Sequence, residues 1–380
     1  MKFLNLLGEK YNNQFECTDN LFVFEMANNH QGSVDHGLNI IREMGKIADE
    51  YKIIAAVKLQ FRDYNTFIHP DADENTNKHI KRFRETRLSH NDFRMMVDEI
   101  KKYDNLICMT TPFDENSVKL ALELDVDILK IGSPSAKDFP LLEIVSSTYK
   151  PIIVSTGGCS IDDIDKLYHF FKHRNNNFAM MHCVSIYPTP TEELNLNMIR
   201  LLKTRFPDIT IGFSTHEEPS NYDAIKLAYC LGARIFEKHV GIETDTITLN
   251  KYSVNPTQLR KWIEGYFIAR KSLGNGNINR KQSEIDDLNK LYRGVFCNRE
   301  IKKGEIINRD DVFFAFPRVE DSISSGEFKE GILSTKNYKI NDPIGNNHYS
   351  NITDPSEIKY HYIHKVKGML NQCKIHLSHD

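Results

Sequence analysis

The feature that most constrains the fold is a series of eight short apolar runs, rich in β-branched residues, in the first two thirds of the chain. The runs are apolar almost throughout, as strands of a parallel sheet that is covered on both faces should be. They are Leu21–Ala27, Ala55–Phe61, Leu106–Thr111, Ile128–Ser133, Pro151–Gly157, Phe178–Ser185, Ile209–His216 and Arg234–Gly241. The sequence therefore predicts eight buried parallel strands.

Amphipathic stretches separate most of these runs and predict helices, because their apolar residues recur at a spacing of three to four. They are Val34–Tyr51, Asp114–Leu124, Pro140–Thr148, Ile161–His173, Leu196–Phe206, Ser220–Leu231 and, after the last run, Pro256–Lys271. Eight alternating units fit a closed (β/α)8 TIM barrel. A doubly wound open sheet is the alternative, although no Gly-x-Gly-x-x-Gly follows the first run. The gap at 62–105 is expected to be a long loop, either functional or ordered by a partner, with a charged piece at 71–87.

The pattern changes after a Gly/Asn-rich linker at 274–279. From Tyr292 onward, short strand-like runs alternate with turns, which predicts a small β-rich second domain. We expect a barrel domain at 1–285, the small domain at 286–348 and an extension at 349–380. The extension contains one expected helix, Glu357–Cys373, and its length suits a linker to a further domain.

Composition excludes several classes of protein. Lys and Arg number 49 against 52 Asp and Glu, so the net charge of −3 argues against a nucleic-acid partner. No apolar run approaches the roughly 20 residues that span a bilayer, and the N-terminus lacks the pattern of a signal peptide. The 7 cysteines form no Cys-x-x-Cys pair, which argues against a disulfide framework and a structural zinc site. We therefore expect a cytoplasmic protein without a membrane partner.

Polar residues lie near the end of every expected strand, where TIM barrels place their active sites. In chain order these are Glu25, Lys58, Gln60, Thr110, Thr111, Lys130, Ser133, Ser155, His182, Ser185, Ser214, His216, Glu237 and His239.

Lys58 and Lys130 are unusual because a buried lysine is costly without a partner that neutralises it. One interpretation pairs each lysine with a buried carboxylate such as Glu25. The interpretation that we favour is an anion site, in which both ammonium groups hold a phosphate or carboxylate. The hydroxyl groups of that site would come from Ser133, Ser155 and Ser214.

His216 and His239 are 23 residues apart, which is one strand–helix–strand step. Neighbouring strands lie about 4.8 Å apart, so the two imidazoles can meet one divalent metal. Two unrelated core histidines are the alternative. Because no firm third carboxylate accompanies the pair, we expect a labile Mn²⁺ or Mg²⁺ rather than structural zinc.

Eight stretches give the chain a resemblance to the sialic acid synthase (N-acetylneuraminate synthase) family. They are FEMANNHQGS, VKLQF, TTPFD, LKIGSPSAKDFPLLE, PIIVSTGG, HCVSIYPTPTEELNL, IGFSTH and FEKHVG, in the family's order across 21–241. The segment Arg293–Pro317 resembles the antifreeze-like (SAF) domain that follows the barrel in these enzymes.

The resemblance implies a transferase of cell-surface polysaccharide biosynthesis. It would condense phosphoenolpyruvate with an open-chain N-acylated amino sugar, similar to N-acetylmannosamine, to give a sialic or related nonulosonic acid and phosphate. The resemblance assigns phosphoenolpyruvate to Lys58, Thr111, Lys130, Ser133, Ser155 and Ser214, and Mn²⁺ to His216 and His239. It places Glu25 where the reacting carbons and the water meet. Further substrate contacts are implied for Gln60, Ser185, Tyr187, Asn250 and Arg318. It also implies a domain-swapped homodimer, in which 316–325 covers the partner's barrel mouth.

Three departures from the family pattern fall on the sugar side. They are Pro134–Ser135 after KIGS, Asn250–Lys251 where an Asp-His pair is usual, and Phe316–Pro317 with Arg318 just beyond. The acceptor is therefore less determined than the reaction. One alternative is a related condensing enzyme with a different or phosphorylated aldose, for which Arg62 and Arg84 are the nearby arginines. Another is a non-catalytic binding protein on the same barrel.

Overall fold

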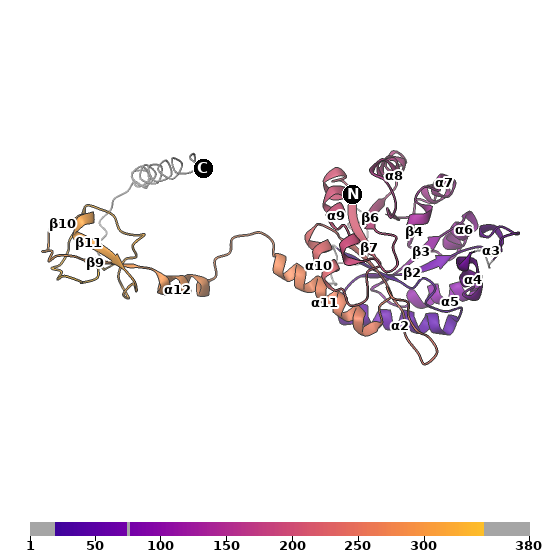
Figure 1. Ribbon diagram of the computed structural model, residues 1–380, viewed down its shortest axis with the longest axis horizontal. Coiled ribbons are helices and arrows are strands. Elements are labelled where there is room, and N and C mark those ends of the chain that lie inside the picture. Colours follow the sequence, from indigo (N-terminus) through magenta and orange to yellow (C-terminus); the bar gives the residue numbers. More distant parts are fainter. Residues whose placement is uncertain (1–19, 74–76, 346–380) are drawn as a thin grey trace, which may run out of the picture. The chain divides into compact units, whose positions relative to one another are not determined.

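The computed structural model describes residues 20–73 and 77–345, and these form two compact units that divide after Gly276 (Figure 1). The division falls within the expected linker at 274–279, whereas the expected boundary at 285 lies inside helix α12 (Gln282–Leu291). The extension at 349–380, with its expected helix Glu357–Cys373, lies outside the described residues.

Eight parallel strands close the barrel in chain order, which confirms the expected TIM-barrel fold. They are β1 (Leu21–Glu25), β2 (Ala55–Phe61), β3 (Leu106–Pro112), β4 (Ile128–Ile131), β5 (Ile152–Ser155), β6 (Phe178–Cys183), β7 (Thr210–Thr215) and β8 (Ile235–His239). Strand β8 pairs with β1 and brings His239 level with Glu25. This pairing closes the sheet and excludes the open-sheet alternative.

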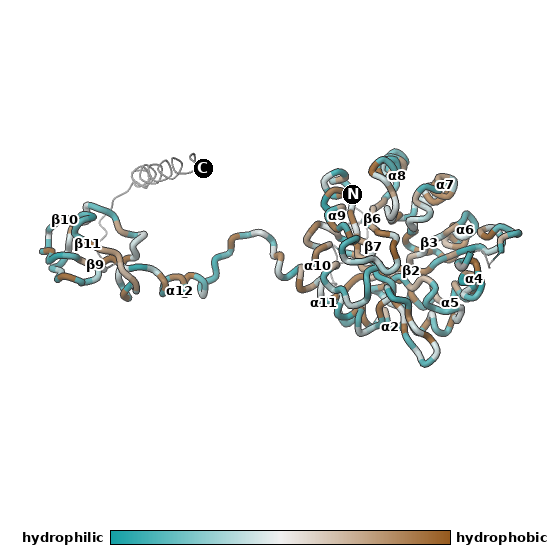
Figure 2. Tube along the Cα trace, viewed as in Figure 1, coloured by the Kyte–Doolittle hydropathy of each residue, from teal (hydrophilic) through white to brown (hydrophobic). Residues whose placement is uncertain are grey.

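Alternation along each strand separates two cores. One set of strand residues, which includes Val23, Ile153 and Ile235, forms a cluster distinct from the larger core. The intervening residues, such as Phe22 and Phe236, belong to the larger core with the helices. Figure 2 shows hydrophobic strand segments in the centre of the barrel unit and more hydrophilic loops around them. Since side chains alternate between faces, each residue's place in its strand determines which core it joins.

The expected helices all form around the barrel. They are α2 (Val34–Glu50), α6 (Glu115–Glu123), α7 (Phe139–Ser147), α8 (Ile161–His173), α9 (Asn197–Arg205), α10 (Asp223–Cys230) and α11 (Pro256–Leu273). No helix among the described residues is long and apolar enough to cross a membrane.

The segment between β2 and β3 differs from the expected long loop. It contains α3 (Tyr64–Phe67), α4 (Lys78–Glu85) and α5 (His90–Ile100). Helix α5 begins at a capping box formed by Ser89 and Asp92, and it buries a stripe of apolar side chains. The stripe comprises Phe93, Met96, Val97 and Ile100. This helical spacing is present in the sequence, but the charged stretch at 71–87 before it is typical of a loop.

The second unit contains α12 and two small antiparallel sheets. Strands β9 (Gly294–Cys297) and β11 (Val312–Ala315) form one sheet, and β10 (Ile306–Ile307) and β12 (Ile332–Leu333) form the other. Helix α12 and strand β12 were not expected. A further short strand-like run of the sequence, Pro343–Ile344, contributes an isolated bridge between Pro343 and Phe296.

Candidate active site

The alternation that builds the two cores also collects the polar residues of the strand ends. Glu25 follows Val23 on the inner face of β1, and Glu237 and His239 follow Ile235 on the inner face of β8. The same alternation places five more residues on the inner face of the barrel, which are Lys58, Thr111, Lys130, Ser155 and Ser214. His182 falls on the opposite face, where its Nε2 lies 2.8 Å from the carbonyl oxygen of Leu194. The apolar strand residues therefore form a floor below a polar layer.

Four charged side chains form a buried cluster in that layer. Lys58 Nζ contacts the Glu25 carboxylate and lies 3.0 Å from Glu237 Oε1. Lys130 Nζ donates a hydrogen bond of 2.8 Å to Glu237 Oε2. The four side chains are at most 5% exposed. Two positive and two negative charges make the cluster neutral, and Lys58 has the carboxylate partner that one sequence interpretation proposed.

Glu237 was predicted only as a polar residue near a strand end, and the sequence predicted no role for it in the site. Burial alone would raise its pKa, but the charges of Lys130 and Lys58 outweigh burial and hold the pKa below its usual range. Its Oε1 also accepts a hydrogen bond of 2.9 Å from Ser214 Oγ. Two lysines within apolar strands were the signal that a second buried carboxylate must be present.

The pKa of Glu25 is shifted in the opposite direction to that of Glu237. Burial raises the pKa of its carboxyl group despite the attraction of Lys58. Its Oε1 accepts a hydrogen bond of 2.6 Å from the backbone N–H of Ala27 and lies 3.4 Å from Gln60 Nε2. Gln60 in turn is level with Thr111 on β3. The carboxylate is therefore fixed in orientation between the lysine and the outer polar residues.

A small polar cradle lies around Gly157, just after β5. Its backbone N–H donates a hydrogen bond of 3.1 Å to Ser133 Oγ. A Cβ on Gly157 would lie 2.3 Å from Ser185 Oγ and 2.6 Å from Ser133 Oγ, so only glycine fits there. The hydroxyl group of Ser155 is buried and has no hydrogen-bond partner. Backbone N–H and hydroxyl donors in such a concavity suit an anion.

His216 and His239 end neighbouring strands, and their ring centroids lie 5.3 Å apart. His216 Nδ1 lies 3.0 Å from the carbonyl oxygen of Val184, so Nδ1 carries the proton and Nε2 is free to accept. His239 Nδ1 is buried and has no hydrogen-bond partner among the described residues. Burial lowers the pKa of His216 to about 4 and that of His239 well below its usual value.

Neutral imidazoles with an unsatisfied buried nitrogen fit a divalent metal. No group of three or more His, Cys, Asp or Glu residues within the described parts of the chain could hold such an ion. A metal here would have two imidazole ligands and take its remaining ligands from outside the chain.

Two tyrosines border the histidines. The Tyr187 ring centroid lies 4.2 Å from that of His216, and the Tyr252 centroid lies 5.1 Å from that of His239. Tyr252 was not predicted as a site residue. Asn250, which was predicted, uses its Oδ1 to accept a hydrogen bond of 3.1 Å from the backbone N–H of Tyr252. The Asn250 side chain therefore stabilises the loop that carries Tyr252.

Arg318 is the one predicted site residue outside the barrel unit. It lies in the second unit, where its Nη1 is 3.8 Å from Glu327 Oε2.

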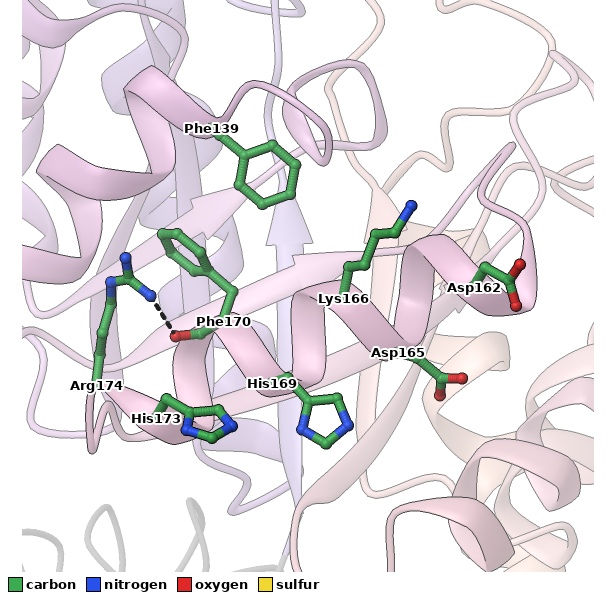
Figure 3. A pocket seen from close by; sticks show the side chains of 8 residues that line it. All are labelled: Phe139, Asp162, Asp165, Lys166, His169, Phe170, His173 and Arg174. Atoms are coloured by element: carbon green, nitrogen blue, oxygen red, sulfur yellow. Dashed lines mark hydrogen bonds between the residues drawn. The ribbon is translucent and has the colours of Figure 1, made fainter.

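A separate hollow of about 620 Å³ lies between α7 and α8, on the helical layer (Figure 3). His169 and His173 lie on its α8 side, and Arg174 stacks on Phe170. The hollow contains none of the strand-end residues.

Fold and site together define a TIM-barrel enzyme whose active site suits an anionic substrate. Residues 47–278 match the NeuB family, and the chain belongs to that family. NeuB-family synthases are transferases that condense phosphoenolpyruvate, which confirms the expected enzyme class. The match ends at residue 278, at the start of the second unit, so an antifreeze-like domain there stays a prediction.

Comparisons with individual proteins agree with this family. The crystal structure of a Chromobacterium violaceum protein designated spore coat polysaccharide biosynthesis protein E is similar, with a TM-score of 0.78 and 38% identity, over 87% of this chain and 100% of that one. N-acetylneuraminate-9-phosphate synthase of Homo sapiens is 26% identical over 76% of this chain and 80% of its own. N,N'-diacetyllegionaminic acid synthase of Campylobacter jejuni is 29% identical over 63% and 72%.

Proposed function

We propose that this chain condenses phosphoenolpyruvate with an open-chain N-acylated amino sugar to give a nonulosonic acid and phosphate. The observation that carries the proposal is the buried cluster of two lysines and two carboxylates beside the Gly157 cradle and two neutral histidines. The human and Campylobacter relatives are designated by different nonulosonic acids, so the acceptor varies within a group that shares the reaction.

Lys58 and Lys130 would hold the phosphate and carboxylate of phosphoenolpyruvate. An ammonium group has three donors, and Lys130 has one carboxylate contact, so it keeps donors for a ligand. The phosphate would enter the cradle of Ser133, Ser155 and Gly157, with Thr111, Ser185 and Ser214 as further contacts.

His216 and His239 would hold Mn²⁺ or Mg²⁺, which when bound supplies Lewis-acid polarisation of the sugar aldehyde. The neutrality of the lysine–carboxylate cluster supports this assignment. Because Glu25 and Glu237 already balance Lys58 and Lys130, a phosphoenolpyruvate anion requires further positive charge nearby.

The chemistry then uses Glu25. The π electrons of phosphoenolpyruvate form a bond from its C3 carbon to the aldehyde carbon, and positive charge develops at C2. The π electrons of the aldehyde move to its oxygen, which takes up a proton and becomes a hydroxyl group. Glu25, held by Ala27 N–H and Lys58, is placed to orient water that adds at C2 and to accept its proton. Phosphate leaves with the electrons of the C2–O bond, and the lysines stabilise its charge. Gln60, Tyr187, Asn250 and Arg318 would face the sugar.

The test measures phosphoenolpyruvate consumption, phosphate release and product mass with a panel of aldoses, N-acylated amino sugars among them. We expect turnover only with amino sugars and a product whose mass equals sugar plus pyruvate. Binding of phosphoenolpyruvate without consumption across the panel would instead support a non-catalytic protein.

A further inference from the structure

Arg62 is a mostly buried cation that forms no direct ion pair within the described parts of the chain, although the charges of Glu25 and Asp114 act on it. Its guanidinium carbon lies 3.8 Å from the ring centroid of Phe113 and 4.2 Å from that of Phe83. Its Nη2 donates a hydrogen bond of 2.9 Å to Gln60 Oε1, which is a neutral acceptor, and its Nε is buried without a partner. Among the ion pairs of the described residues, none involves Arg62.

This arrangement leaves a charge to be balanced. Burial lowers the pKa of Arg62 to about 10, which is still far above neutrality, so the guanidinium stays charged. The two phenyl rings favour a cation at this point but do not neutralise it. A buried charge without a counterion is costly, and the counterion can come from a ligand.

A second arginine lies in the same region. Arg82 on α4 donates a hydrogen bond of 2.8 Å to Gln31 Oε1 and one of 3.1 Å to the carbonyl oxygen of Asn28. Both acceptors are neutral, and no ion pair in the described parts of the chain involves Arg82. Phe83, whose ring lies against Arg62, is the neighbour of Arg82 on α4. Burial, followed by the charges of Arg82, His36 and Arg62, lowers the pKa of His30 to about 4. Arg84, the other arginine expected here, is exposed on α4.

These arginines come from other segments of the barrel unit than the proposed phosphoenolpyruvate cradle. Gln60 connects Arg62 to Glu25, because its Nε2 lies 3.4 Å from Glu25 Oε1. The cradle residues belong to segments after β4 and β5, whereas Arg62 follows β2 and Arg82 lies on α4. Two separate groups of residues therefore offer donors for anions, as the joining of two substrates requires.

We infer that Arg62 and Arg82 together bind an anionic group on the acceptor, so that this enzyme takes a phosphorylated or otherwise acidic amino sugar. The inference rests on the proposed function. A guanidinium group suits a phosphate because its fork of N–H donors can bind two phosphate oxygens at once. The carboxylate of phosphoenolpyruvate is the other source of the same chemistry, and the experiment separates the two.

The experiment compares N-acetylmannosamine with its 6-phosphate. Calorimetry without phosphoenolpyruvate measures the affinity of the wild-type chain for each sugar, and we expect tighter binding of the phosphate. Steady-state kinetics then gives the ratio of kcat/KM for the two sugars. We expect Arg62→Gln to reduce that ratio at least about 30-fold, which is the lower end for truncating one partner of a buried charge pair.

Arg82→Gln provides a second variant that leaves the Phe83–Phe113 sandwich intact, and the ratio should fall in the same direction. Arg94→Gln, which removes an exposed arginine from α5, is the matched control and should leave the ratio unchanged. The dissociation constant of phosphoenolpyruvate should be the same in all variants.

Equal affinity of the wild-type chain for both sugars would overturn the inference. It would also be overturned if Arg62→Gln weakened phosphoenolpyruvate binding and left the sugar ratio unchanged. Tight binding of the sugar phosphate without consumption of phosphoenolpyruvate would support the inference while contradicting the proposed function.

Discussion

A single carboxylate, Glu237, positions both lysines of the candidate site. Its two oxygens accept from Lys58, Lys130 and Ser214, which come from three different strands. This geometry agrees with both interpretations of the lysines that the sequence allows, which are pairing with a buried carboxylate and an anion site. The two interpretations differ in what a substitution does to substrate affinity.

Lys130→Met tests that difference. We expect the KM for phosphoenolpyruvate to rise at least about 30-fold and the KM for the sugar to stay unchanged, because the lost charge faces the phosphate. Lys58 still partners Glu237 in the variant, so the fold should persist. The exposed Lys137→Met is the control. A parallel rise of both KM values would favour a purely structural lysine.

Gly157→Ala should fill the proposed cradle. The new methyl group would collide with Ser185 Oγ and Ser133 Oγ, which is overpacking that costs roughly 1–3 kcal/mol of stability. We expect phosphoenolpyruvate affinity to fall about tenfold or more, measured by calorimetry. Gly326→Ala, whose Cβ would have only Ser324 Oγ within 4 Å, is the control. Unchanged affinity would show that the anion binds elsewhere.

The metal prediction concerns His216 and His239. His216→Ala or His239→Ala should abolish activity and Mn²⁺ binding while the far-ultraviolet circular dichroism spectrum stays unchanged. Chelation should inactivate the native protein, and Mn²⁺ should restore it but not the variants. Full turnover in chelator, with the absence of metal verified by elemental analysis, would contradict the metal site.

At the scale of elements, a second buried ion pair joins the ends of β7 and β8. Lys238 alternates with Glu237 and His239 and therefore points to the other face of β8. Its Nζ lies 3.0 Å from Glu217 Oε1 and donates a hydrogen bond of 3.0 Å to the Glu217 carbonyl oxygen. Both side chains are 1% exposed. The pair holds together the two strand ends that carry the histidines.

Lys238→Met should lower the free energy of unfolding by about 3–5 kcal/mol, because it leaves the Glu217 carboxylate buried without its partner. Chemical denaturation measures the loss. The double variant Lys238→Met/Glu217→Leu replaces the pair with apolar groups and should recover most of it. A loss below about 1 kcal/mol in the single variant would show that the pair contributes little.

At the scale of the whole molecule, the family resemblance predicts a homodimer in which Phe316–Ser325 of one chain covers the partner's barrel mouth. Among the described residues of the second unit, the core consists of eight buried apolar residues, so docking would add to its stability. Deleting the chain from Tyr292 onward should then abolish turnover even where the barrel folds.

Subunit mixing tests the exchange directly. His239→Ala disables the barrel, and Arg318→Ala disables the covering segment. If the segments are exchanged, random mixing of the two inactive proteins should restore about a quarter of wild-type activity, since half of the dimers are mixed and half of their sites are intact. Mixtures that stay inactive, or a fully active monomer in sedimentation, would contradict the exchanged dimer.

The sequence by itself determined the barrel, because each strand is a local apolar run and the alternation of strands and helices is a local pattern. It also indicated which strand ends carry the candidate residues, since parallel closure places every strand's carboxyl end on one face. It predicted no role for Glu237 or Tyr252, and it did not show that His182 faces away. It did not reveal α5, although its apolar stripe and the capping box of Ser89 and Asp92 were present.

The tertiary structure alone decided which charges pair. Lys130 and Glu237 are 107 residues apart, and no local pattern predicts that contact. The Gly157 cradle and the aromatic sandwich around Arg62 likewise join segments far apart in the chain. Such partners are determined by the register of barrel closure and by packing between loops. These depend on the whole chain at once, whereas strand and helix patterns depend on near neighbours.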